Sequence, residues 1–132
     1  MGILDLDFEG VDTGSGYTLV SAGDHGFAIT KCDDKTDEAR PHVIYTLTCN
    51  DGSPSDGATL QYRLYFEEKS MPFAKRFLQH VLGVSIEGKL SNYVSDFADL
   101  VGYAVEGVVD HNANGSKIYA NLNAFSLSQP ED

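Results

Sequence analysis

Aromatic, basic and amide side chains fall at alternating positions in residues 58–67 and 117–127 of this chain, a pattern that can bind unpaired nucleic-acid bases. Between residues 58 and 67, Arg63 and Tyr65 alternate with apolar residues and so fall on the opposite face of an extended segment. Planar rings stack on unpaired bases, cations hold phosphates and amides read base edges. The residues predicted to contact single-stranded nucleic acid are Lys31, Arg63, Tyr65, Lys117, Tyr119, Asn121 and Phe125.

The same residues have a second interpretation that needs no ligand. Aromatic side chains favour strands, and an outward ring also packs across neighbouring strands. Lys75 and Arg76 belong to the polar side of a predicted helix, which we expect to close one end of a barrel. We therefore assign these two residues to a solvated helix face, and both interpretations of the outward rings stay open.

Patterns typical of catalysis or metal binding do not stand out in the sequence. The four histidines lie in different predicted elements, and none is at metal-ligand spacing from a cysteine or another histidine. The sequence has no Gly-x-Ser-x-Gly elbow, P-loop or dinucleotide fingerprint. The acidic segment 33–38 lacks the ligand pattern of an EF-hand, and a hairpin turn explains the Asp and Asn residues at 110–114. We therefore expect a non-enzymatic protein with no cofactor and no metal ligands.

Apolar periodicity and turn residues divide the chain into five strands and two helices. Proline suits the first turn of a helix and glycine often ends one, so Pro72 and Gly83 delimit a helix. Ser91 is placed to cap a second helix, which Gly102 ends. The predicted strands are 26–32, 42–49, 58–67, 103–111 and 117–127, and the predicted helices are 72–82 and 92–101.

Alternation within the strands also predicts which side chains are buried. In the second strand the core side carries Val43, Tyr45 and Leu47. In the third strand the predicted core residues are Leu60, Tyr62, Leu64 and Phe66, and in the last strand they are Ile118, Ala120, Leu122 and Ala124.

Three strands, a helix and two strands follow one another in the chain order of the OB-fold, a small five-stranded barrel. We predict an all-β fold with a helical insertion, a five-stranded OB-fold-like barrel with helices between strands three and four. The chain has 132 residues, of which 42% are hydrophobic, and this fits one domain. We assign residues 1–24 to an N-terminal arm or extra strand, 25–127 to the OB-fold-like domain and 128–132 to a short acidic tail.

The charge of the chain opposes binding to a polyanion. The formal net charge is −11, so a nucleic-acid binder must gather its basic residues locally. The sequence has neither a basic, then apolar leader nor a long apolar run, so we expect a cytoplasmic protein without a membrane span. In that compartment Cys32 and Cys49 are expected to be reduced thiols.

Three stretches of the sequence resemble a known family. They are Gly26-Phe27-Ala28-Ile29, the run from Asp51-Gly52 to Phe73-Ala74-Lys75-Arg76-Phe77-Leu78 and Leu82-Gly83, and the pair Gly102–Gly107 and Gly115–Leu122. Over residues 24–127 the chain resembles small phage-encoded single-stranded-DNA-binding proteins with an OB-fold. This resemblance implies sequence-tolerant binding of single-stranded DNA in phage replication or recombination, in the host cytoplasm. It also implies that Lys117, Tyr119 and Asn121 form a binding strand.

An alternative function is a phage protein–protein interaction module, such as a virion component or an inhibitor of a host factor. The acidic composition favours this alternative. For the leading hypothesis the expected partners are single-stranded DNA and phage or host replication and recombination proteins. Exposed edges of a sheet are also compatible with a homodimer.

Overall fold

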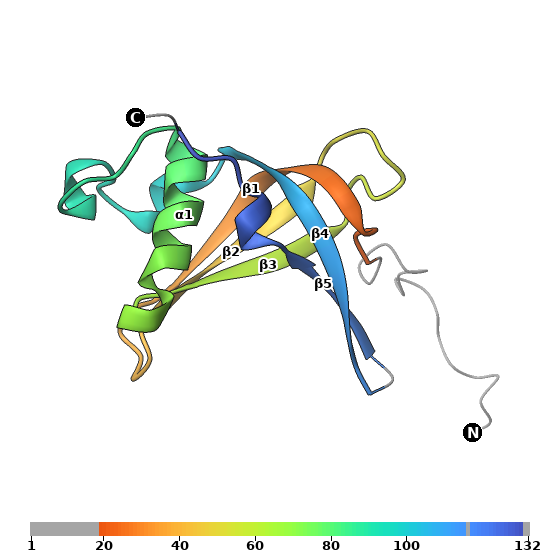
Figure 1. Ribbon diagram of the computed structural model, residues 1–132, viewed down its shortest axis with the longest axis horizontal. Coiled ribbons are helices and arrows are strands. Elements are labelled where there is room, and N and C mark those ends of the chain that lie inside the picture. Colours follow the sequence, from red (N-terminus) through yellow and green to blue (C-terminus); the bar gives the residue numbers. More distant parts are fainter. Residues whose placement is uncertain (1–18, 116, 131–132) are drawn as a thin grey trace, which may run out of the picture.

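Strand β1 (Gly23–Lys35) organises the molecule because it has a partner strand along each edge. The computed structural model describes residues 19–115 and 117–130, and these form one five-stranded antiparallel sheet with one α-helix (Figure 1). The other strands and the helix are β2 (His42–Cys49), β3 (Thr59–Tyr65), α1 (Met71–Leu82), β4 (Ala104–Asn114) and β5 (Lys117–Leu122). The mostly-β class and the helix between the third and fourth strands are as predicted.

A bulge in β1 divides the strand between its two partners. Residues 23–28 pair with β4 and residues 27–35 pair with β2, and the β2 register shifts between Ile29 and Lys31. The backbone of Ile29 instead bonds the segment before β4, through Ile29 N–H to Tyr103 O (2.9 Å) and Gly102 N–H to Ile29 O (2.7 Å). Because a bulge bends a strand and increases its twist, the sheet curls and carries its two outer strands toward each other.

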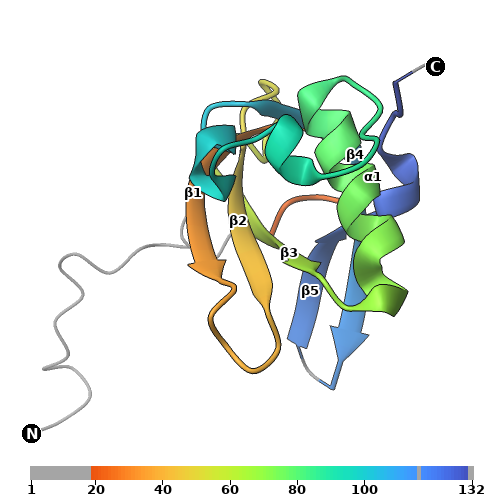
Figure 2. The same cartoon turned by 90° about the vertical axis from the view of Figure 1, so that its left-hand side faces the viewer.

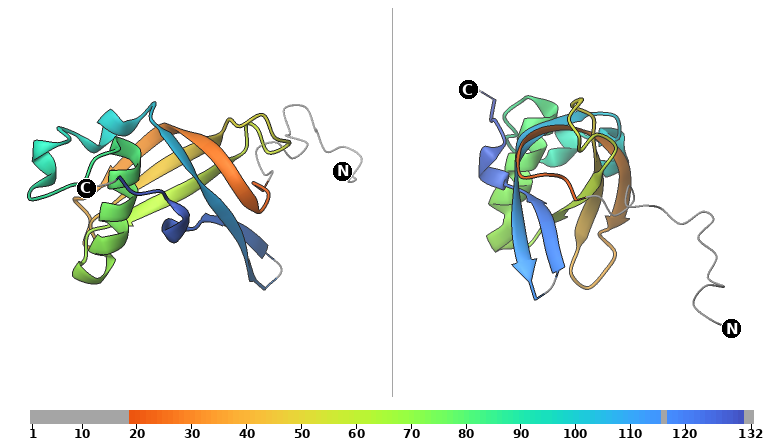
Figure 3. Two further views of the ribbon diagram at one scale, coloured as in Figure 1. Left: turned by 45° about the horizontal axis from the view of Figure 1, so that its top comes forward. Right: turned by 90° about the vertical axis from the view of Figure 1, so that its right-hand side faces the viewer.

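The curled sheet does not close into a barrel. The strand order is β3-β2-β1-β4-β5, which is compatible with an OB-like fold, but β3 and β5 share no hydrogen-bonded ladder. The predicted closed five-stranded barrel is therefore wrong in its closure. Strands β4 and β5 project beyond the rest of the sheet (Figures 1 and 3). An open groove is lined by residues of β3 and β5.

Helix α1 lies across one end of the curled sheet (Figure 2). Its Phe77 ring stacks on two tyrosine rings of the sheet. The Phe77 ring lies between Tyr62, at 4.6 Å between ring centroids, and Tyr45, at 5.6 Å. The helix begins at Met71 with Pro72 in its first turn and ends at Gly83, whose φ of 72° is left-handed. The predicted span 72–82 and its glycine stop are confirmed, as is the burial of Val43, Tyr45 and Leu47.

The predicted second helix is wrong. Residues 92–101 instead contribute to two short 3₁₀ segments, Leu90–Asn92 and Phe97–Leu100. The Asp96 carboxylate accepts a hydrogen bond from Ala98 N–H and so starts a separate turn. The buried Tyr45 hydroxyl also donates to the carbonyl of Phe97 at 2.8 Å, which fixes this turn to β2.

The C-terminal part of the prediction also needs correction. Strand β5 ends at Leu122, and a 3₁₀ turn, Ala124–Ser126, follows it instead of more strand. Ile118 was expected in the core but is 57% exposed, because the projecting end of β5 has no layer packed over it. Of the predicted arm and tail, residues 1–18 and 131–132 lie outside the described residues. The described part of the tail is fixed to α1, since Gln129 donates to Arg76 O at 2.9 Å.

One glycine allows the C-terminal turn to pack against β4. A Cβ atom at Gly107 would stand 2.9 Å from Leu122 Cδ1, 2.9 Å from Ser126 Oγ and 3.1 Å from Leu127 Cδ2. The two 2.9 Å distances are shorter than real Cβ contacts, so a side chain at this position must displace the side chains of Leu122 and Ser126.

We predict that Gly107→Ala lowers the free energy of unfolding by about 1–3 kcal/mol, the usual cost of overpacking. Gly26→Ala is the matched control, because its added Cβ meets nothing nearer than 3.7 Å. Urea denaturation followed by circular dichroism measures both variants. Equal stability of the two variants would contradict the close approach at Gly107.

Candidate nucleic-acid interface

An open groove between β3 and β5 collects three of the predicted binding residues, Arg63, Tyr119 and Asn121. The groove has no carboxylate in its lining, and its walls are the outer strands of the sheet (Figure 3). The lining residues are Leu19, Thr59, Leu60, Gln61, Arg63, Ile118, Tyr119, Ala120 and Asn121. A ring, a guanidinium and two amides thus face one solvent-filled space, which suits bases and phosphates together.

The groove cation Arg63 and the neighbouring Lys117, which precedes the lining residue Ile118, have no carboxylate partner among the described residues. Arg63 donates to Gln61 Oε1 at 3.1 Å, and this bond orients the guanidinium without cancelling its charge. Lys117 is exposed at the start of β5. Among the described residues, neither cation forms an ion pair. Tyr119 is 47% exposed, so its ring is accessible from solvent.

Strand register places the predicted residues Lys31 and Tyr65 on the outward surface of β1, β2 and β3. Lys31 is opposite Thr46, which is opposite Gln61 of the groove, so these three form one row across the sheet. Lys31 lies two strands away from the groove and pairs with Asp33 at 3.6 Å. The free ends of the β1–β2 and β4–β5 hairpins point the same way, with β3 between them (Figure 2).

Tyr65 is on the predicted outward side, but its ring is already in use. The Arg40 guanidinium lies 4.0 Å from the ring centroid, and the His42 ring lies 5.1 Å away. Arg40 is itself held by the Glu67 carboxylate. The half-buried Tyr65 ring therefore offers less surface to a base than Tyr119 does.

The structure separates Phe125 from the other predicted residues. Phe125 is in the 3₁₀ turn after β5, not on an outward face of the strand, and the residues that line the groove do not include it. Its 70% exposed ring makes an edge contact with Phe73 at 5.7 Å and lies 5.4 Å from the Arg76 guanidinium. Arg76 in turn donates to Ala124 O at 2.9 Å, so this cluster fixes the turn to α1.

A second polar cluster joins the start of β1 to the end of β2, and the sequence analysis missed it. His25 Nδ1 is 2.7 Å from Asp51 Oδ2, and Cys49 Sγ is 3.4 Å from Asp51 Oδ1 and 3.7 Å from His25 Nδ1. Along the chain His25 is 24 positions from Cys49 and 26 positions from Asp51, and strand pairing brings the three residues together. The only sequence signal was a Cys and an Asp two residues apart at the end of a strand.

The protonation states of the cluster follow from its surroundings. Hydrogen bonds from Ser53 and His25 hold the pKa of the Asp51 carboxyl well below its usual range, so Asp51 is a carboxylate at neutral pH. Burial raises the pKa of the Cys49 thiol. Asp51 and Cys49 both approach Nδ1 of His25, while Nε2 is 2.8 Å from Ser21 O. In a Cys–His–Asp catalytic triad the thiol and the carboxylate use opposite ring nitrogens, so these three residues do not form one.

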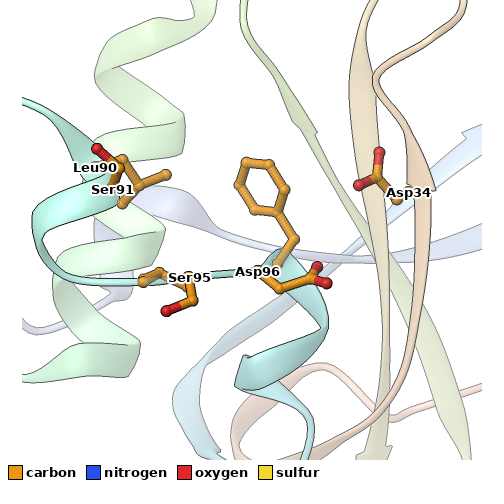
Figure 4. Close-up of a pocket in the computed structure, with 7 residues that line it drawn as sticks. Asp34, Leu90, Ser91, Ser95 and Asp96 are labelled. Carbon is orange, nitrogen blue, oxygen red and sulfur yellow. The ribbon is translucent and has the colours of Figure 1, made fainter.

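A further recess lies between the 90–97 segment and β1 (Figure 4). Its lining includes Asp34, Leu90, Ser91, Ser95 and Asp96, with Asp34 on the side opposite Leu90 and Ser91. The two carboxylates repel phosphate, so this recess does not extend the candidate interface.

Comparison with protein-family models and with curated proteins finds no match for the chain. Within the described residues, no helix is long and apolar enough to cross a membrane.

We predict that tetranitromethane nitrates Tyr119 and the 44% exposed Tyr103 before Tyr45 and Tyr62. The reagent attacks the phenolate, and burial raises the pKa of both Tyr45 and Tyr62. Peptide mass spectrometry after short exposures gives the order of modification. Early nitration of Tyr45 or Tyr62 would contradict the aromatic stack beneath α1.

Proposed function

We propose that this chain is a non-enzymatic single-stranded-DNA-binding protein of OB-fold type whose binding site is the groove between β3 and β5. The observation that carries the proposal is that Arg63, Tyr119 and Asn121 line one groove with no carboxylate among its lining residues. In the OB-fold, oligonucleotides bind on the face of strands 2 and 3, between the loops that join strands 1–2 and 4–5. The groove lies beside β3, one of these two strands, and this supports the proposal.

In this proposal each groove residue has a separate role. The Tyr119 ring stacks on an unpaired base, which is worth about 1–3 kcal/mol per base. Arg63 and Lys117 neutralise phosphates on either side of that base, and the Asn121 and Gln61 amides contact base edges. Stacking accepts every base, so the proposed binding tolerates sequence variation. Lys31, which pairs with Asp33 two strands from the groove, is outside the proposed site, and Tyr65 supports Arg40 instead of stacking directly.

The biological setting of the proposal comes from the family that the sequence resembles. A protein of that kind acts in phage replication or recombination, in the cytoplasm of the host, alongside phage or host proteins of those processes. The proposal needs no cofactor.

We predict that Tyr119→Ala weakens binding to a labelled oligo-dT by roughly 5–150-fold, which corresponds to the loss of about 1–3 kcal/mol of stacking. Tyr103→Ala is the matched control, since Tyr103 is equally accessible, at 44% against 47%, but lies outside the groove. Fluorescence anisotropy titrations at low salt measure both variants. Equal losses in the two variants would remove Tyr119 from the site.

We also predict that Arg63→Gln makes the salt dependence of binding less steep. For single strands the log–log slope against salt is about −0.7 per neutralised phosphate, so the slope should change by about 0.7. Lys89→Gln, a cation outside the groove lining, should leave the slope unchanged. A slope near zero for the unmodified chain, or no binding to oligo-dT at low salt, would overturn the proposed function.

A second candidate function is a protein–protein interaction module. It is favoured by the unpaired edges of β3 and β5, the two outer strands of the described sheet. Such edges accept an extended segment of a partner or of a second copy of the chain through backbone hydrogen bonds. This function predicts no binding to oligonucleotides at low salt. If the partner is a second copy, sedimentation also gives a mass that rises from monomer to dimer with protein concentration.

A further inference from the structure

The His25–Cys49–Asp51 cluster has the spacing of a metal site. Around a tetrahedral zinc ion, with Zn–S about 2.3 Å and Zn–N and Zn–O about 2.0–2.2 Å, ligand atoms stand roughly 3.4–3.6 Å apart. In the cluster, Sγ lies 3.4 Å from Asp51 Oδ1 and 3.7 Å from His25 Nδ1. One ligand atom from each of the three residues lies within 4.8 Å of the others. Only the 2.7 Å hydrogen bond between His25 and Asp51 is too short, and it must lengthen when an ion replaces its proton.

The groups around the cluster fix the ligands in the orientation that a metal needs. Metal-bound histidines usually donate their second ring N–H to a carbonyl or carboxylate, which exposes the other nitrogen. His25 Nε2 has this partner in Ser21 O, at 2.8 Å, and Nδ1 faces Cys49 and Asp51. The Asp51 carboxylate also accepts N–H bonds from Gly26 at 3.2 Å and Ser53 at 3.0 Å.

We propose that His25, Cys49 and Asp51 bind one zinc ion, with solvent as the fourth ligand. A thiolate, an imidazole and a carboxylate form a donor set that suits zinc better than the hard cations Ca²⁺ and Mg²⁺. The site opens to solvent through a depression lined by His25, Asp51 and two further carboxylates, Asp24 and Glu106. These carboxylates attract a cation to the opening.

Binding balances both protons and charge. The ion displaces two protons, one from the Cys49 thiol and one from the Nδ1–H that His25 directs at the Asp51 carboxylate, while the ring keeps its proton on Nε2. One thiolate and one carboxylate then neutralise the two charges of Zn²⁺ in a site where Cys49 is 1% and His25 is 7% exposed. The ion joins the start of β1 to the loop after β2, which the cluster already links by hydrogen bonds. This link does not depend on the proposed DNA binding.

Cobalt is the probe for this site, because Co²⁺ takes the place of Zn²⁺ and is coloured. The full chain, stripped with a chelator, is titrated with Co²⁺ and then with Zn²⁺. We expect one equivalent to give the visible bands of tetrahedral cobalt and a near-ultraviolet thiolate-to-cobalt absorption, and Zn²⁺ to abolish them. Zinc should also raise the melting temperature.

Two variants and one matched control decide the assignment. Cys49→Ala should abolish the thiolate absorption, and Asp51→Asn should weaken zinc binding by about 100-fold or more. Cys32→Ala should change neither, since Cys32 is the other free cysteine and lies outside the cluster. Asp51 is in an exposed loop, so its variant tests the site even if Cys49→Ala does not fold. No thiolate absorption in the unmodified chain, its loss in Cys32→Ala, or unchanged zinc affinity in Asp51→Asn would overturn the proposal.

Discussion

The whole arrangement depends on how β1 shares its hydrogen bonds between two partners. Its first residues pair with β4 and its later residues pair with β2, and the bulge after Ile29 turns the strand from one partner to the other. The Ile29 N–H donates to Tyr103 O and its C=O accepts from Gly102 N–H at the turn into β4, so the Ile29 backbone stays hydrogen-bonded at the bend. The bend determines where β3 and β5 end up, and the groove is the space that remains between them.

The core explains why the sheet can remain open. The Phe77 ring stacks between Tyr45 and Tyr62, so α1 fills the end of the curled sheet with three rings. Burial of apolar surface dominates folding, and this stack does not need a β3–β5 ladder to be complete. The outer edge of β5 is then left without a partner strand, and Arg63 and Tyr119 on the two outer strands remain accessible.

The sequence was sufficient wherever one local pattern acted alone. Strand β2 alternates without interruption, and α1 has a proline at its start and a glycine after its end, so both were located almost to the residue. The prediction was wrong where the local structure includes a contact with a residue far away in the sequence. The Tyr45 hydroxyl bonds the Phe97 carbonyl from 52 positions away, and the segment around it does not become a helix. Arg63 and Tyr119 were identified from alternation. The contact between His25 and Cys49 could not be predicted without knowing how β1 pairs with β2.

The net charge of −11 is a weaker objection to nucleic-acid binding than it first suggests, because charge acts locally. Six of the twenty carboxylates lie in residues 1–18 and 131–132, where there is no Lys or Arg. At about 0.1 M salt, exposed charges more than roughly 10 Å apart are largely screened from each other. A phosphate beside Arg63 therefore responds mainly to the side chains of the groove. No carboxylate lines that groove, whereas the recess beside Asp34 and Asp96 contains two. Asp110 of β4 is opposite Asn121 in register, and its carboxylate accepts a hydrogen bond from the Asn123 amide.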